Sequence, residues 1–420
     1  MKQGIFLVMP GPFRIVEGQI KLDDQACKGL VRWVENFDRV VLACPVVPEH
    51  LVATSKTSII WQAITDLPCA DRVELVPLPY AYKIQDFIQT YKTTSQLLSA
   101  KIQECQYLCF VLSGVIGDWG AIACLKAIKL KRPYAVWTDR VEYEVISRTL
   151  LKQESLKTRP LKQLLKNLLL LPLLKPYQRY LCRRSQLGLF QGQDCYSAYS
   201  SFCKNSYCIY QTHTQKSDQI DSSNLNLKIQ SLSHGEPLLI CYVGRATEMK
   251  GPLDWLRVIH HLCKAGIHLK ATWVGDGPLL SDMKSLADKL GIADKVHLTG
   301  FVGDYKQVLE YMKKHHIFLF CHKTPESARC LTESLVSGCP IVGYSSLYPE
   351  EIVSKYGGGV FVPINNWQKL ADVIVELNSD RAKLKEIILN AALSGQQFDE
   401  QSLYQNRSDL IKHYLNINYC

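Results

Sequence analysis

The apolar residues of this chain gather in short runs that amphipathic stretches separate. Such runs of nearly unbroken apolar residues are typical of parallel strands that helices cover on both faces. The first half therefore predicts a doubly wound α/β domain. Its predicted strands are IFLVM (5–9), RVVLAC (39–44), VELVPLP (73–79), YLCFVLS (107–113), YAVWTD (134–139) and LGLFQG (187–192).

A polar stretch over residues 213–237 interrupts this pattern, and then the alternation restarts. We predict two Rossmann-like, doubly wound parallel-sheet domains, residues 1–215 and 237–395, that face each other across a cleft, with a linker at 216–236. We expect a helical tail of about residues 396–420 to cross back onto the first domain. The predicted strands of the second domain are PLLICYVG (237–244), LKATWVG (269–275), VHLTGF (296–301), IFLFC (317–321), PIVGY (340–344) and GGVFVP (358–363).

The composition is that of a globular protein, with 420 residues, 47% hydrophobic and 21% charged. No apolar run reaches the length of a membrane span, and the run at 5–9 is too short for a signal peptide, so we expect a cytoplasmic protein. The 16 cysteines include no Cys-x-x-Cys pair, so we expect reduced thiols in the core. The histidine doublets at 260–261 and 315–316 lack the spacing of ligands on one helix face, so no metal site is predicted.

The net charge of +10 is concentrated in one segment, because residues 150–184 contain nine basic residues against one acid, a local charge of +8. Within it, residues 160–184 place leucines at helical spacing opposite Lys162 and Lys166, and Pro172 and Pro176 should end or bend this helix. One interpretation is peripheral contact with an anionic membrane surface; the other is an ordinary helix packed on its own domain. We expect no nucleic acid, because leucines dominate and aromatic residues are not interleaved with the basic ones.

Two glutamates, Glu326 and Glu333, lie seven positions apart just after the predicted strand at 317–321. A helix that starts near Ala328 and ends at Gly338 would place Glu326 in the loop at its mouth and Glu333 about one and a half turns inside. The exposed amides at such a mouth attract anions, including phosphate. The alternative is that Glu326 only caps the helix and Glu333 is an ordinary exposed acid.

Other strand ends of the second domain carry complementary groups. Arg245 and Lys250 flank a loop that begins at Gly244, and these two side chains suit phosphate oxygens, although solvated charge at a helix start is the alternative. The ends of the next two strands, WVGDGP (273–278) and HLTGFV (297–302), should lie on the same edge of one sheet. A positive clamp, a tight turn, a slot for a base and a pair of carboxylates would then converge.

In this order and spacing, GRATEMKG (244–251), VGDGP (274–278), LTGFV (298–302) and ESARCLTESLVSGCPIVGY (326–344) resemble the carboxyl-terminal domain of GT-B glycosyltransferases. The similarity is to the large retaining family 4, the glycosyl transferases group 1. It covers roughly residues 237–395, and the first half is similar only in its strand pattern. Six residues separate the two glutamates, where the commonest pattern of the family has seven.

The resemblance implies a retaining glycosyltransferase of the hexosyltransferase type (EC 2.4), which moves a sugar from a nucleoside-diphosphate sugar to an acceptor hydroxyl. The acceptor would be a glycan or a lipid-linked molecule in the synthesis of cell-surface polysaccharide or glycolipid. Arg245 and Lys250 would hold the diphosphate and stabilise the departing nucleotide, Glu326 would contact the donor sugar, and Glu333 would bind the ribose hydroxyls. Further donor contacts would come from Gly11, Gly244, Gly275, Phe301, Val302, Ser327 and Ala328.

On the acceptor side, Asp139 falls where many relatives carry a histidine or an acid near the transferred sugar, and it would orient or deprotonate the acceptor hydroxyl. The alternative for Asp139 is an N-cap of the helix that follows, and Asp118 is a second candidate. No Asp-x-Asp occurs, so no metal or other cofactor is expected. A nucleotide-sugar epimerase and a non-catalytic nucleotide- or glycan-binding protein on the same fold remain alternatives.

Overall fold

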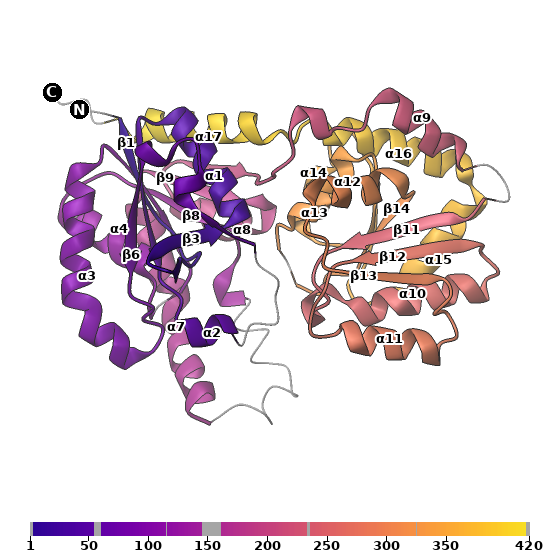
Figure 1. The fold of residues 1–420 in the computed structure, drawn as a ribbon, viewed down its shortest axis with the longest axis horizontal. Helices are drawn as coiled ribbons and strands as arrows, with labels where there is room; N and C mark the ends of the chain where they lie inside the picture. The colour runs from indigo at the N-terminus through magenta and orange to yellow at the C-terminus, as the bar shows by residue number, and fades with distance from the viewer. Residues whose placement is uncertain are drawn as a thin grey trace. The chain divides into compact units, whose positions relative to one another are not determined.

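A computed structural model describes residues 3–53, 60–114, 116–144, 161–232, 236–324 and 326–416. These residues form two compact units (Figure 1). The first unit holds the described residues up to 210 and those from 401 onward, and the second unit holds residues 211–400. Each unit is built on one parallel sheet with helices on both faces, which confirms the predicted fold class of two doubly wound α/β domains.

The sheet of the first unit has seven parallel strands in the order β10-β9-β8-β7-β1-β4-β6. All but β10 were predicted. The strand β10 escaped prediction because its sequence, SYCI, is only half buried at the sheet edge and has no apolar run. The strands are β1 (Gly4–Val8), β4 (Arg39–Pro45), β6 (Val73–Leu78), β7 (Tyr107–Val111), β8 (Ala135–Thr138), β9 (Leu187–Gln191) and β10 (Ser206–Ile209).

The strand β1 shows why these runs are continuously apolar. Ile5 and Leu7 pack into one hydrophobic cluster, and Phe6 and Val8 pack into another on the opposite face of the sheet. Because successive side chains of a strand point to opposite faces, a strand that is covered on both faces needs apolar residues at every position. The covering helices are α1 (Asp24–Asn36), α3 (Ile84–Glu104), α4 (Trp119–Lys129), α7 (Leu161–Arg184) and α8 (Gly192–Tyr199), with the short α2 (Glu49–Ala53) after β4.

The chain after β1 and a second stretch after α2 form a small antiparallel sheet, which the sequence did not predict. Its strands are β2 (Arg14–Val16), β3 (Gln19–Asp23) and β5 (Trp61–Ala63). A two-residue turn joins β2 to β3, and Glu17 and Gly18 both adopt positive φ angles of 52° and 76° there, as such hairpin turns require.

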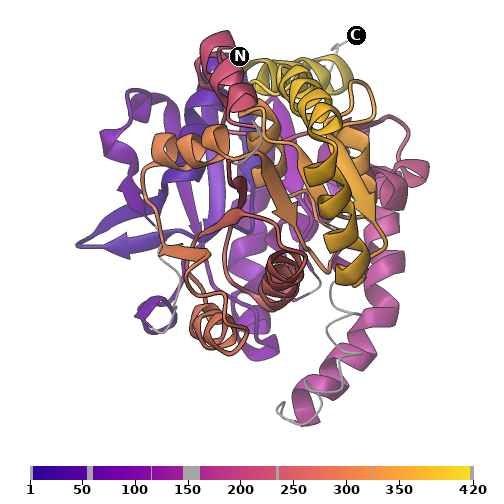
Figure 2. The same cartoon turned by 90° about the vertical axis from the view of Figure 1, so that its right-hand side faces the viewer.

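The helix α7 runs without interruption from Leu161 to Arg184, with both prolines inside it. Of the two outcomes predicted for Pro172 and Pro176, that they end or bend the helix, the first is wrong. Its amino-terminal end extends away from the sheet of its unit (Figure 2). The leucine side chains at 161–169 lie outside the described side chains. In the carboxyl-terminal half, Leu174 and Leu181 are buried. That half is therefore a packed helix. No helix in the described ranges is long and apolar enough to cross a membrane.

The second unit has a six-stranded parallel sheet in the order β13-β12-β11-β14-β15-β16, and all six strands were predicted. In Figure 1, α10 and α11 cover one face of this sheet, and α12 and α13 lie on the other. The strands are β11 (Leu238–Val243), β12 (Leu269–Val274), β13 (Val296–Gly300), β14 (Ile317–Phe320), β15 (Ile341–Tyr344) and β16 (Gly359–Val362). The helices are α9 (Ser222–Gln230), α10 (Pro252–Lys264), α11 (Leu280–Lys289), α12 (Tyr305–Lys314), α13 (Arg329–Val336), α14 (Leu347–Ile352), α15 (Trp367–Ser379) and α16 (Arg381–Gly395).

The polar segment 216–236, expected to be a linker, contains the helix α9 within the second unit. Lys228 of α9 is buried, with 3% of its surface exposed. Its Nζ donates to the carbonyl oxygens of Met312 at 3.2 Å, Ser337 at 2.8 Å and Gly338 at 2.9 Å. These carbonyls follow or end α12 and α13, where helices leave acceptors unpaired. In the sequence, nothing distinguishes the buried Lys228 from the exposed polar residues around it.

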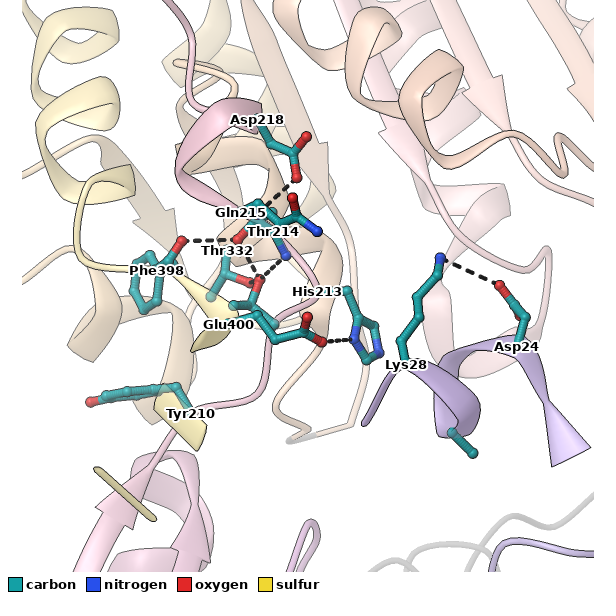
Figure 3. Close-up of polar contacts among 12 residues, drawn as sticks. Asp24, Lys28, Tyr210, His213, Thr214, Gln215, Asp218, Thr332, Phe398 and Glu400 are labelled. Atoms are coloured by element: carbon teal, nitrogen blue, oxygen red, sulfur yellow. Dashed lines mark hydrogen bonds and ion pairs between the residues drawn. The ribbon is translucent and has the colours of Figure 1, made fainter. Parts of the chain in front are cut away.

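The chain passes between the units twice, at residues 210–211 and 400–401. Within the second unit, hydrogen bonds join the two passing segments (Figure 3). Thr214 Oγ1 donates to the carbonyl oxygen of Phe398 at 2.9 Å, and the backbone N–H of Glu400 donates to the carbonyl oxygen of Thr214 at 2.8 Å. The Nδ1 atom of His213 lies 2.7 Å from Glu400 Oε1, with both side chains buried. The two crossings are thus tied side by side.

The helix α17 (Glu400–Leu415) packs into the first unit, where Tyr404 and Ile411 belong to the hydrophobic cluster of one sheet face. Arg407 is buried, and its guanidinium lies 4.5 Å from the ring centre of Trp137 and donates to the carbonyl oxygen of Tyr210 at 3.0 Å. A buried guanidinium needs such aromatic and carbonyl partners to offset its lost hydration. The helix is therefore an integral part of the first unit.

Candidate active site

The sheet of the second unit reverses its strand order between β11 and β14. From β11 the chain continues outward to β12 and β13, whereas from β14 it continues the other way to β15 and β16. The loops that follow these two neighbouring strands therefore leave in opposite directions. In open α/β sheets, ligands bind at the carboxyl ends of the strands at such a reversal. This edge of the sheet holds most of the predicted site residues.

The loops after β11 and β14 are in direct contact. Gly251, at the end of the β11 loop, has a positive φ of 65°, and a Cβ atom there would lie 2.1 Å from the carbonyl oxygen of Cys321. The backbone N–H of Lys323 also donates to the carbonyl oxygen of Met249 at 2.8 Å. Only glycine permits this approach. Because Gly251 has no side chain, the two loops approach closely, and the neighbouring Lys250 contacts the residues that follow β14.

The loops after β12 and β13 continue the same edge. Gly275, at a φ of 140°, leaves no room for a Cβ atom, which would lie 2.2 Å from the carbonyl oxygen of Gly244. Its N–H donates to the carbonyl oxygen of Gly300 at 2.9 Å. Phe301, directly after β13, is 47% exposed, and Val302 is half-buried. An exposed phenylalanine beside packed backbone loops offers a flat apolar surface to a ligand ring.

A cluster of four polar side chains lies where the β11 and β14 loops meet. Lys250 Nζ lies 2.5 Å from Glu326 Oε1, and His322 Nδ1 lies 2.7 Å from the same oxygen. The other ring nitrogen of His322, Nε2, lies 2.6 Å from the hydroxyl of Tyr242. Lys250 and Glu326 keep 17% and 21% of their side chains exposed, whereas His322 keeps 1%. The carboxylate of Glu326 is thus partly exposed to solvent and contacts the buried ring of His322.

The pKa values of this cluster keep Glu326 ionised. Burial acts to raise the pKa of Glu326, but the contacts with His322 and Lys250 outweigh it and lower this pKa to about 2. Burial, followed by the charge of Lys250, lowers the pKa of His322 to about 4, so the imidazole is neutral at pH 7. At neutral pH the cluster therefore contains one carboxylate, one ammonium and one neutral ring.

The helix α13 places the second glutamate. It begins at Arg329, with Ala328 as a cap that makes no side-chain hydrogen bond, so the alternative in which Glu326 caps the helix is wrong. Glu333 is 9% exposed, so the alternative of an ordinary exposed acid is wrong as well. Ala328 is buried and Ser327 half-buried at the mouth of the helix. The mouth of α13 therefore lies at the edge that holds Glu326.

Arg245 lies in the same loop as Lys250 but differs from it in surroundings. Its side chain is exposed, and its carbonyl oxygen accepts from the N–H of Thr247 at 2.8 Å. No ion pair formed by the described residues involves its guanidinium. Arg245 is therefore available to an anion from solution, whereas Lys250 already has an anionic partner in Glu326.

The two remaining predicted residues, Gly11 and Asp139, belong to the first unit. Gly11 is exposed, its φ is not positive, and no atom lies within 4 Å of an added Cβ, so nothing in this unit requires glycine there. Asp139 is exposed and directly follows β8; the helix proposed to need it as a cap lies partly outside the described residues. Asp118 is instead a structural N-cap of α4: its carboxylate accepts from the N–H groups of Ser113, Gly114 and Ala121 at 2.8, 2.8 and 2.9 Å. These contacts give Asp118 a structural role at the start of α4.

Sequence reasoning missed two residues of the edge, His322 and Asp254. Asp254 Oδ2 accepts from Lys323 Nζ at 2.8 Å and from the hydroxyl of Tyr344 at 2.9 Å, which braces the loop after β14 against α10 and β15. The signal for His322 was its position, a polar residue two places after an apolar strand. For Asp254 the sequence offers no signal, because an acid in the first turn of a helix usually only favours the helix dipole.

The histidine doublet at 315–316 is part of the core. His316 Nε2 lies 2.7 Å from Ser231 Oγ, and His315 Nδ1 lies 2.5 Å from the carbonyl oxygen of Tyr311. Across the described ranges, no group of three or more histidine, cysteine, aspartate or glutamate side chains is arranged to hold a metal ion. The 15 described cysteines are all free thiols, and 11 of them are buried.

Comparison with known proteins finds a family match for part of the chain. Residues 224–393 match the family of glycosyl transferases group 1. The chain is 22% identical over 154 residues to alpha-D-kanosaminyltransferase from Streptomyces kanamyceticus, 37% of this chain and 40% of that protein. It is 31% identical over 86 residues to alpha-monoglucosyldiacylglycerol synthase from Streptococcus pneumoniae, 20% of this chain and 19% of that protein. The chain thus matches less than half the length of these relatives.

Among solved structures, the whole fold is similar to that of Anabaena Alr3699/HepE in complex with UDP. The TM-score is 0.68 at 16% identity, over 98% of this chain and 100% of that one. A structure of HepE with UDP-glucose is similar as well, with a TM-score of 0.64 at 15% identity, over 98% and 99% of the two chains. Together with the family match, these structures confirm the resemblance to GT-B glycosyltransferases.

Proposed function

We propose that this chain, whose residues 224–393 belong to the glycosyl transferases group 1 family, is a glycosyltransferase with a nucleoside-diphosphate sugar as its donor. The observation that carries the proposal is the meeting of Lys250, Glu326 and the mouth of α13 at the strand-order reversal. A diphosphate needs positive charge and the positive end of a helix dipole, and a sugar needs a fixed acceptor of hydrogen bonds. This edge supplies both within adjacent loops.

In this proposal Arg245 and Lys250 bind the diphosphate. When the bond between sugar and phosphate breaks, negative charge grows on the departing nucleoside diphosphate, and two cations in contact with it stabilise that charge. The amides of Ser327 and Ala328 add to this at the helix mouth. These groups supply the positive charge from the chain itself, so the proposed step is drawn without a metal ion.

The two glutamates bind the two sugar rings of the donor. Glu326, ionised and partly exposed, accepts hydrogen bonds from sugar hydroxyls, and Glu333 from the ribose hydroxyls. Phe301 and Val302 line the base, and Gly244 and Gly275 keep the loops around it close to the ligand. Gly11 and Asp139 of the first unit complete the proposal, Gly11 towards the donor and Asp139 as the group that orients the acceptor hydroxyl.

We assign retention of the anomeric configuration to the reaction, on the similarity of the motifs to the retaining family. The acceptor we propose is a glycan or a lipid-linked precursor of surface polysaccharide or glycolipid, and the place of reaction the cytoplasmic face of a membrane. Two observations support this. One relative is named for a diacylglycerol product, and the leucine-rich amino-terminal half of α7 carries Lys162 and Lys166 without an acid.

Thermal unfolding with nucleotides tests the donor. UDP, GDP and ADP and their glucose conjugates are added to the full chain, and a ligand at a hundred times its Kd should stabilise the protein by about 2.7 kcal/mol. Glu333→Ala should remove most of that stabilisation. The matched control is Glu386→Ala on α16, an exposed glutamate whose loss should leave it unchanged. A chain that no nucleotide stabilises is not a glycosyltransferase of this kind.

Turnover separates the enzyme from its alternatives. The wild type should release nucleoside diphosphate from the donor that stabilises it, slowly with water and faster with an acceptor. Donor binding without release would indicate a non-catalytic binding protein, and conversion of the sugar within the intact donor would indicate an epimerase.

Flotation with liposomes tests the membrane surface. The wild type should float with vesicles that contain anionic lipid, and Lys162→Glu with Lys166→Glu should abolish flotation. The control is Lys383→Glu with Lys385→Glu, the same change of charge on exposed lysines of α16. If both double variants float like the wild type, α7 does not bind membranes.

A further inference from the structure

Two side-chain nitrogen atoms lie against one oxygen atom of Glu326. Lys250 Nζ and His322 Nδ1 lie 2.5 and 2.7 Å from Oε1. One donor is a charged ammonium on a partly exposed side chain, and the other belongs to a side chain with 1% exposure. Because one of these side chains is partly exposed and the other is buried, we expect them to act differently on Glu326.

The surroundings of His322 indicate which of its nitrogens carries the proton. Nδ1 lies 2.7 Å from a carboxylate oxygen of Glu326, which can only accept, so this contact is favourable only with hydrogen on Nδ1. The other nitrogen, Nε2, then accepts from the hydroxyl of Tyr242, which lies 2.6 Å away. Tyr242 is buried, and burial raises the pKa of its hydroxyl, so it keeps the proton that it donates. His322 is thus a neutral donor with one permitted tautomer.

The ring of His322 is buried and packed against two other rings, so it does not face a ligand directly. The ring centre of Phe320 lies 4.1 Å from it, and that of Tyr242 lies 5.7 Å from it. Any effect of His322 on a bound donor must therefore pass through Glu326. Lys250, in contrast, has a flexible stem and partial exposure, so it can change partner.

Under the proposed function, Lys250 pairs with two anions in turn, with Glu326 before the donor binds and with the diphosphate afterwards. A carboxylate that loses its only partner in a partly buried place is costly, and that cost would weaken donor binding. We propose that His322 is a positioning residue that holds Glu326 in place while Lys250 transfers from this glutamate to the diphosphate of the donor. This inference rests on the proposed function and adds to it an exchange of partners within the site.

A double-mutant cycle tests the exchange. The Kd of UDP, or of GDP or ADP where that binds more tightly, is measured by calorimetry for the wild type, His322→Leu, Glu326→Gln and the double variant. His322→Leu should weaken binding about tenfold, because a hydrogen bond to a charged group is lost when Lys250 leaves. In the Glu326→Gln background no carboxylate remains to be orphaned, and the same change should alter the Kd less than about twofold.

Two further variants separate this role from a merely structural one. His322→Asn places an amide N–H near the position of Nδ1 and should restore most of the affinity that His322→Leu loses. Ser231→Ala is the control. It removes the partner of another buried histidine, His316, whose Nε2 lies 2.7 Å from Ser231 Oγ. This contact is not part of the candidate site, so the Kd should stay unchanged. Should His322→Leu fail to fold, Tyr242→Phe frees the tautomer of His322 at constant volume, and the cycle is repeated with it.

The results of this cycle distinguish failure of the inference from failure of the proposed function. Equal loss of affinity in both backgrounds would mean that His322 only supports the loop, and no loss in either would mean that Glu326 needs no support; each overturns the inference while nucleotide binding by the wild type stands. If the wild type binds none of the three diphosphates, the proposed function fails and the inference fails with it. Loss that depends on Glu326, with recovery in His322→Asn, supports the exchange.

Discussion

Replacement of Lys228 by methionine should destabilise the second unit. The ammonium of Lys228 satisfies carbonyl oxygens at the ends of two helices, at 2.8 Å for Ser337 and 2.9 Å for Gly338. The third acceptor, the carbonyl of Met312, also accepts from the N–H of His315 at 3.3 Å, so it keeps a partner. Two buried carbonyls would then be left without this donor.

The expected loss follows from these two carbonyls. Each unsatisfied buried acceptor costs about 1 to 3 kcal/mol, and the release of a buried charge returns part of this, so we expect the free energy of unfolding to fall by about 2 to 4 kcal/mol at pH 7. Urea unfolding of the full chain measures the loss, and hydrogen exchange of residues 329–338 locates it. Lys383→Met on the exposed face of α16 is the control and should change stability by less than about 0.5 kcal/mol.

The pH dependence gives a second and sharper test. Burial lowers the pKa of Lys228 from 10.5 to about 8. Between these values the unfolded chain binds more protons than the folded one, so the stability of the wild type rises with pH relative to the methionine variant. From pH 7 to pH 9 the difference between the two proteins should grow by about 1 kcal/mol. A loss below about 1 kcal/mol at pH 7, or a difference that shrinks with rising pH, would refute this reasoning.

Three further predictions concern a cap, a glycine and an acid. Asp118→Ala should cost about 2 kcal/mol in urea unfolding, because three backbone N–H groups lose their acceptor; a cost near zero would contradict the cap. Gly251→Ala should abolish the nucleotide-dependent rise in melting temperature, because its Cβ would lie 2.1 Å from the carbonyl of Cys321, whereas Gly266→Ala, with nothing within 4 Å, should cost only about 1 kcal/mol of stability and keep the rise. The pKa of Glu326 is lowered to about 2, so its contribution is present above pH 4.5 and declines below it; from pH 5 to pH 3 the wild type should lose about 2 kcal/mol more than Glu326→Gln in urea unfolding, and parallel curves would show that Glu326 is not held as described.

The sequence predicted the sheets well because both are buried on both faces. Consecutive residues such as Ile5 and Phe6 enter different hydrophobic clusters, so every position of β1 must be apolar. The strand therefore appears in the sequence as an unbroken apolar run. The small sheet of β2, β3 and β5 has only half-buried strands of three to five residues, and such strands leave no apolar run. Their one readable signal, Glu17 before Gly18, is a weak one.

For the candidate site, backbone placement was predictable and side-chain support was not. Helix α13 begins at Arg329 with Ala328 as its cap, one residue from the predicted start, because an apolar strand and a terminal glycine bound it. That Lys250 would pair with Glu326 depends on the approach of two loops far apart in sequence, which needs the strand order. The role of Tyr242 was hidden for another reason: within a strand, a tyrosine hydroxyl cannot be distinguished from an ordinary core ring.

The course of the chain has a consequence for the order in which the units can fold during synthesis. The second unit is one continuous stretch, residues 211–400, and can close as soon as that stretch has emerged. The first unit begins earlier but lacks Tyr404 and Arg407 until α17 is made, so the cluster around Trp33 stays incomplete through most of translation. The part synthesised first is thus the part finished last, and a fragment that stops at residue 210 should aggregate unless α17 is joined to it.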